Sequence, residues 1–160
     1  VAEGNPAQAL KLLGEASQLD PKNEWVRVDA AAIMLNAGEM EEARRLLASL
    51  SPATAQESAV QELLARLAFA DKAKDLPEAG TLSQRIAANE NDLDARLQLA
   101  NLLIAQQQYE PALAQLLEIV QRDKSYADEA GRKTMLSLFQ LLGNSELVSR
   151  YRRLLASALN

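Results

Sequence analysis

Paired carboxylates are the side chains in this sequence whose type and spacing could carry acid–base chemistry. Glu41 is adjacent to Glu42, and Asp128 to Glu129, and two neighbouring carboxyl groups can act as general acid and base. The 160-residue chain has no histidine and no cysteine, which excludes histidine-activated nucleophiles, thiolate catalysis and sulfur-ligated zinc. Each acid pair is expected at a helix start or on a charged helix face, where acids complement the helix dipole. We therefore predict no enzyme, no cofactor and no metal site.

The elements that would position these residues are helices that repeat in pairs. The composition, rich in alanine and leucine with 6 glycines and 5 prolines, favours helix almost throughout. Gly4 and Ala9 return 34 residues later as Gly38 and Ala43. This stride is that of the tetratricopeptide repeat, which the sequence resembles.

Later repeats keep the same pattern with small changes. Ala112 and Leu116 occupy the positions of Ala43 and Leu47, where a small side chain lets two helices cross closely and a leucine fills the seam between repeats. In the fourth repeat, Gln107 stands near the position of the turn glycine.

The expected fold is all-α, a tetratricopeptide-repeat superhelix of antiparallel helix pairs, in a single domain over residues 1–160. The repeats are expected at about 1–21, 22–54, 55–90 and 91–124, with a capping pair at 125–160. Helices are expected at about 6–18, 22–37, 40–49, 55–71, 77–88, 93–106, 126–142 and 145–159. Only three residues precede Gly4, so the chain is expected to be a fragment whose first repeat lacks its first helix.

In such repeats the first helix of each pair lines a concave wall that holds other polypeptides. Alignment on the repeated alanines predicts a protein-binding wall of Trp25, Val28, Leu35, Leu64, Leu97, Asn101 and Ile104. The side-chain amide of Asn101 is suited to pin an extended peptide backbone; the alternative is a bond to a neighbouring helix or to water. Trp25 either anchors a ligand or packs internally.

Charge is unevenly distributed along the chain. Residues 1–120 carry 10 Lys and Arg against 18 Asp and Glu, whereas residues 121–160 carry 7 against 4. At this basic end, Arg150, Tyr151, Arg152 and Arg153 belong to an amphipathic helix that either docks an acidic protein or is a solvated cap. The net charge of −5 and the lack of an aromatic platform beside the arginines argue against nucleic acid. No long apolar stretch or signal segment is found, so we predict a cytoplasmic location and no membrane partner.

Two segments near the end of the chain support a narrower resemblance. Residues 131–143 and 151–155, and upstream residues 91–100, resemble the C-terminal domain of bacterial thioredoxin-like co-chaperones called chaperedoxins. The resemblance implies a preceding thioredoxin domain and holdase activity toward unfolded clients. It also implies transfer of clients to ATP-dependent chaperones, including the chaperonin, with the helix from Arg150 to Leu159 as the docking element.

We therefore predict a protein–protein interaction domain of a thioredoxin-like holdase, which binds unfolded clients and a partner chaperone. Any redox activity would belong to the thioredoxin domain. The alternative is a structural scaffold or dimerisation domain that positions the thioredoxin domain, with a homodimer of this chain as its consequence.

Overall fold

Helices make up all the regular structure in the part of the chain that can be described. The computed structural model describes residues 6–160, except for the side chains of residues 6–8 and 16–17. Within that range it contains ten helices and no strand, which confirms the all-α prediction. The expected turn at Gly4 lies outside the described residues.

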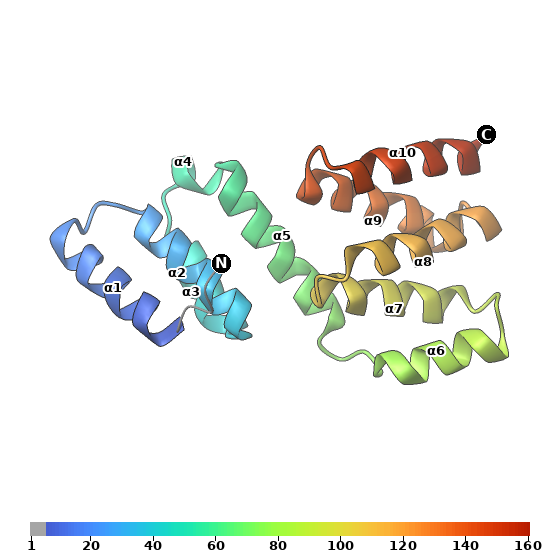
Figure 1. Cartoon of the computed structure of the whole chain (residues 1–160), viewed down its shortest axis with the longest axis horizontal. Coiled ribbons are helices and arrows are strands. Elements are labelled where there is room, and N and C mark those ends of the chain that lie inside the picture. Colours follow the sequence, from blue (N-terminus) through green and yellow to red (C-terminus); the bar gives the residue numbers. More distant parts are fainter. Residues whose placement is uncertain (1–5) are drawn as a thin grey trace. The chain divides into compact units, whose positions relative to one another are not determined.

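The chain divides into two compact units, Val1–Ala68 and Phe69–Asn160, each with a hydrophobic core of its own. The first unit holds α1 (Pro6–Leu19), α2 (Trp25–Ala37), α3 (Met40–Ala48), α4 (Pro52–Ala55) and most of α5 (Ser58–Ala73). The second holds α6 (Ala79–Ala88), α7 (Leu93–Ala105), α8 (Tyr109–Arg122), α9 (Tyr126–Leu142) and α10 (Glu146–Leu159) (Figure 1). The repeat boundaries and the single domain remain predictions.

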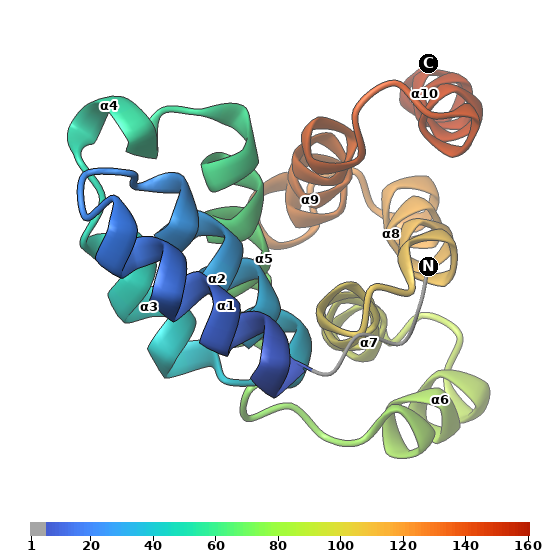
Figure 2. The same cartoon turned by 60° about the vertical axis from the view of Figure 1, so that its left-hand side comes forward.

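In the first unit, α2 packs between α1 and α3. Ala43 and Leu47 of α3 are 0% and 4% exposed, in the crossing positions that the sequence predicts. Figure 2 shows α1, α2 and α3 lying beside one another. The buried alanine lets the α2 and α3 backbones approach closely.

Two helix ends share one backbone arrangement. At the end of α2, Gly38 has a φ of 85°, and the next amide donates to the carbonyl of Met34. At the end of α7, Gln107 has a φ of 60°, and the next amide donates to the carbonyl of Leu103. Gln107 therefore adopts the left-handed conformation that glycine adopts without steric cost.

Glu24 joins the start of α2 to the loop between α3 and α4. Its carboxylate accepts hydrogen bonds from the Ser51 amide (3.1 Å) and hydroxyl (2.7 Å), and it pairs with Arg27 at 3.0 Å. Hydrogen bonds from the hydroxyls of Thr54 and Ser51 hold the pKa of Glu24 at about 2, below its ordinary 4.5. Ser51 also caps α4 by accepting from the Thr54 amide. A short α4 therefore precedes α5, where the sequence predicts one helix over 55–71.

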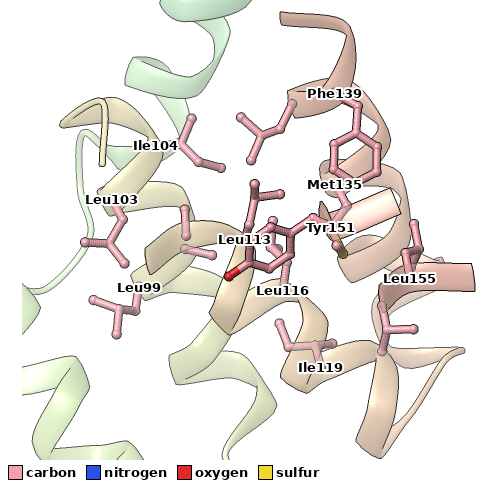
Figure 3. Packing of buried hydrophobic residues seen from close by; sticks show 14 of the residues in the cluster. Leu99, Leu103, Ile104, Leu113, Leu116, Ile119, Met135, Phe139, Tyr151 and Leu155 are labelled. Carbon is pink, nitrogen blue, oxygen red and sulfur yellow. The ribbon is translucent and has the colours of Figure 1, made fainter. Parts of the chain in front are cut away.

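The second unit is built around α8, which contacts α7, α9 and α10. Ala112 and Leu116 of α8 are fully buried, as the repeat pattern predicts. Figure 3 shows Leu113 and Leu116 of this helix close to Met135 of α9 and Tyr151 of α10. One apolar cluster thus holds the helices of this unit together.

Helix α9 comes very close to α8 at Gly131. A methyl group on Gly131 would lie 3.1 Å from the Cγ2 atoms of Ile119 and Val120, and 3.2 Å from the carbonyl oxygen of Leu116. Optimal contacts between carbon atoms are about 3.5–4.0 Å. The absence of a side chain at Gly131 therefore sets the separation of the two helices.

The first turn of α9 is left-handed. Ala127, Asp128 and Glu129 have φ values of 47°, 58° and 59°, a conformation that costs a non-glycine residue about 1–2 kcal/mol. Ion pairs with Lys133 and Arg132, at 2.5 and 2.7 Å, hold the two acids of this turn. The regular part of α9 thus begins later than the sequence predicts.

The contact at Gly131 predicts that Gly131→Ala destabilises the chain relative to Gly80→Ala by about 1–3 kcal/mol. Both glycines lie in helices and gain the same helix propensity from alanine, but nothing lies within 4 Å of the position of a Cβ atom at Gly80. Urea denaturation followed by circular dichroism measures the difference. Equal effects of the two substitutions would show that α8 and α9 are not in contact at Gly131.

Relief of the left-handed turn predicts that Gln107→Gly stabilises the chain by about 1 kcal/mol. The control is Gln106→Gly. Gln106 has a φ of −84°, so glycine there only adds freedom to the unfolded chain and destabilises by about 0.4–1 kcal/mol. Denaturation curves of the two variants should therefore shift in opposite directions, and a shift in the same direction would contradict the assignment.

The lowered pKa of Glu24 predicts a pH-dependent contribution to the stability of the first unit. Because the folded-state pKa of about 2 lies below 4.5, the ionised carboxylate stabilises the fold above pH 4.5, and this stabilisation is lost as the pH falls toward 2. Unfolding of wild type and Glu24→Gln can be followed by the fluorescence of Trp25, the only tryptophan. Wild type should be more stable at neutral pH, with the difference shrinking below pH 4.5. A difference that stays constant with pH would contradict this role.

Candidate protein-binding surfaces

Both acid pairs of the sequence are engaged in ion pairs on helix surfaces. Glu42 pairs with Arg45 in α3, and Asp128 pairs with Lys133 in α9. The hydrogen bond from Lys133 lowers the pKa of Asp128, which favours the ionised carboxylate. Residues 6–160 contain no group of three or more acidic side chains placed to hold a metal ion. Over the same residues, no helix has the length and apolar character to cross a bilayer.

In the first unit, the predicted wall divides into buried and exposed residues. Val28 and Leu35 are 4% and 5% exposed and pack in the core with Ala43, which corrects the prediction that they line an open surface. They lie seven residues apart on the stripe of α2 that packs inside the unit. Trp25 and Leu64 are 46% and 38% exposed and remain accessible to a ligand.

In the second unit, the predicted wall is largely enclosed. Ile104 is 3% exposed and belongs to the core of this unit (Figure 3). Leu97 is partly buried and packs against the same core. The side-chain oxygens of Asn101 and Gln98 are buried without a hydrogen-bond partner among the described residues. Ile104 is therefore a core residue, contrary to the prediction. A ligand could reach the Asn101 oxygen only after a side-chain movement, and its role in binding a peptide backbone stays a prediction.

The predicted docking residues of α10 serve two different purposes. Tyr151 is 6% exposed, and its hydroxyl donates to the carbonyl of Glu110 at 3.4 Å. Arg150 pairs with the Glu110 carboxylate and lies 5.2 Å from the centre of the Tyr151 ring. These two residues attach α10 to α8, and their predicted role in docking a partner stays a prediction. Arg152 and Arg153 are exposed.

A groove of about 480 Å³ lies between α9 and α10. Its lining residues are Arg132, Leu136, Phe139 and Gln140 of α9 and Arg152, Leu155, Ala156 and Leu159 of α10. Phe139 and Leu155 are almost fully buried and form the apolar base, whereas Leu136 is 42% exposed. Because α10 packs mainly on α8, the face between α9 and α10 remains open. We call this feature the C-terminal groove.

Two arginines line the rim of the C-terminal groove. The guanidinium of Arg152 lies 5.7 Å from the centre of the Phe139 ring, within range of a cation–π contact, and it has no carboxylate partner in the part of the chain described. Arg132 pairs with Glu129 through one nitrogen, which leaves other N–H donors of its guanidinium. None of the lining residues is acidic. The groove therefore combines an apolar base with an uncompensated cation.

The sequence contained a signal for this groove that the repeat alignment did not use. Arg132, Leu136 and Gln140 recur every four residues along α9, and Arg152, Ala156 and Leu159 follow at helical spacing along α10. Such spacing places side chains on one helix face. It does not reveal that the two faces lie side by side, because that depends on how α10 packs on α8.

Two family models identify the repeat in this chain. Models of the tetratricopeptide repeat match residues 72–160 and residues 1–67. A solved domain of VP0806, a protein of unknown function from Vibrio parahaemolyticus, is 29% identical and covers 95% of this chain and 89% of its own, with a TM-score of 0.43. No curated protein matches the chain. Tetratricopeptide repeats generally mediate protein–protein interactions, and the chain belongs to the tetratricopeptide repeat family.

Proposed function

We propose that this chain is the client- and partner-binding module of a cytoplasmic thioredoxin-like co-chaperone of the chaperedoxin type. Tetratricopeptide repeats bind proteins, and the resemblance of residues 131–143 and 151–155 to chaperedoxins supports the narrower assignment. We assign no reaction to the chain itself, and any dithiol chemistry would belong to a thioredoxin domain.

The observation that carries the proposal is the exposure of large apolar side chains on a helical scaffold. On the predicted wall these are Trp25 and Leu64. The other exposed ones among the described residues, Leu12, Leu19, Leu136 and Leu154, lie outside that wall. Scattered exposed leucines are common on protein surfaces, but a partly exposed tryptophan is suited to anchor a bound segment. A holdase needs such surfaces because unfolded clients present apolar segments.

In the first unit, the proposed client-binding wall consists of Trp25 and Leu64, because the other two predicted wall residues, Val28 and Leu35, are buried. Substitution of an exposed residue leaves the core intact, so loss of activity would report on binding and not on folding. Substitution of Leu35 would instead remove a core contact.

We expect the chain to suppress aggregation of a chemically unfolded model enzyme, measured by light scattering. The double variant Trp25→Ser, Leu64→Ser should require at least about twofold more protein for the same suppression, because it loses apolar anchors. The matched control is Leu12→Ser, Leu19→Ser, which removes two exposed side chains of α1. Circular dichroism checks that both variants remain helical.

Failure of the wild-type chain to suppress aggregation would refute the holdase proposal. Equal activity of the wall variant and the control would refute the binding role of Trp25 and Leu64. A chain that dimerises in analytical ultracentrifugation, and becomes monomeric on Trp25→Ala, would favour the scaffold function instead. Retention of purified chaperonin on the immobilised chain would support the co-chaperone assignment.

A further inference from the structure

We propose that the C-terminal groove between α9 and α10 binds a short acidic amphipathic segment of a partner protein, with apolar side chains in the groove and a carboxylate on Arg152. The inference deepens the proposed protein-binding function and rests on it. It specifies the chemistry of one partner and a second binding surface, separate from Trp25 and Leu64.

The shape and lining of the groove suit a few apolar side chains of a peptide. Its volume is about 480 Å³, and it is open to solvent. Phe139 and Leu155 form a base that is already buried, while Leu136 and Ala156 are exposed at its sides. A helix that places leucines at positions i, i+3 and i+4 would cover these exposed side chains, as in other helix-in-groove complexes.

The charge of the groove selects an acidic partner. Arg150, two residues before Arg152, is neutralised by Glu110. Arg152 has no such partner among residues 6–160, and its contact with the Phe139 ring restrains the guanidinium at the groove. A planar guanidinium binds a carboxylate through two hydrogen bonds, and a restrained one loses less conformational entropy on binding. Arg132 lies at the α9 side of the groove, where Glu129 compensates its charge.

Other macromolecules fit the groove less well. Single-stranded nucleic acid is bound by exposed aromatic rings on which bases stack, but Phe139 is only 3% exposed. A protein segment that carries leucines and carboxylates fits better, because its leucines can contact the apolar base of the groove and a carboxylate can pair with Arg152 at the rim.

The test measures binding of a fluorescein-labelled peptide of about twelve residues with leucines and glutamates at helical spacing, and of a counterpart with lysines in place of the glutamates. Fluorescence anisotropy with the full 160-residue chain should detect the acidic peptide and not the basic one. The affinity should fall as sodium chloride is raised, because a partly exposed ion pair is screened by salt.

Matched substitutions show whether peptide binding depends on the groove itself or only on the overall charge and hydrophobicity of the chain. Arg152→Glu should weaken binding at least about tenfold, whereas Arg153→Glu, an equal change of charge outside the lining, should have little effect. Leu136→Ser should weaken binding, whereas Leu154→Ser, at a similarly exposed leucine outside the lining, should not. Circular dichroism confirms that each variant remains helical.

Several results would overturn the inference. These are no binding of the acidic peptide at about 1 mM, equal losses in Arg152→Glu and Arg153→Glu, or displacement of the peptide by a single-stranded oligonucleotide. Self-association that depends on Arg152 would make a second copy the occupant and would also overturn it. If the peptide fails to bind while the chain still suppresses aggregation through Trp25 and Leu64, the groove inference fails alone. If the peptide binds but aggregation is not suppressed, the holdase function fails alone.

Discussion

The close approach of neighbouring helices at residues with little or no side chain is the constraint on which both units depend. Ala43 in the first unit and Ala112 in the second are completely buried, and at Gly131 even a methyl group would press on two side chains and a carbonyl oxygen of α8. Because these contacts bring backbones together, leucines at the adjacent positions can fill the space between helices at high packing density. A larger residue at a crossing would separate two helices and expose the leucines around it.

The packing of the last helix shows how such a scaffold creates a binding surface. Tyr151 and Arg150 attach α10 to α8 through Glu110, while α10 has little contact with α9. The buried face of α10 therefore packs on α8, and a neighbouring face of α10 lines the C-terminal groove together with α9. Because α10 packs on α8, it stays attached to the unit while an apolar strip between α9 and α10 remains open.

Electrostatics divide the charged residues into those that stabilise the fold and those that remain available. Glu24 connects α2 to the loop before α4 through Ser51 and Arg27, and Arg85 connects the end of α6 to the start of α7 through Asp92. These contacts join segments that are adjacent in the fold, and their charges are compensated. Arg152 differs because its described contact is to an aromatic ring, so its charge remains free to select a partner.

The sequence alone determined the all-α class, the repeat family and the burial of Ala43 and Ala112, because each depends on periodicity and on the size of single residues. It could not determine which face of a first helix stays open. Val28, Leu35 and Ile104 have the spacing of a binding stripe, yet they are buried, since an apolar stripe that lines a ligand and one that meets another helix look the same in sequence. The C-terminal groove was decided only by tertiary structure. Its two walls come from different helices, and they meet because Tyr151 attaches α10 to α8.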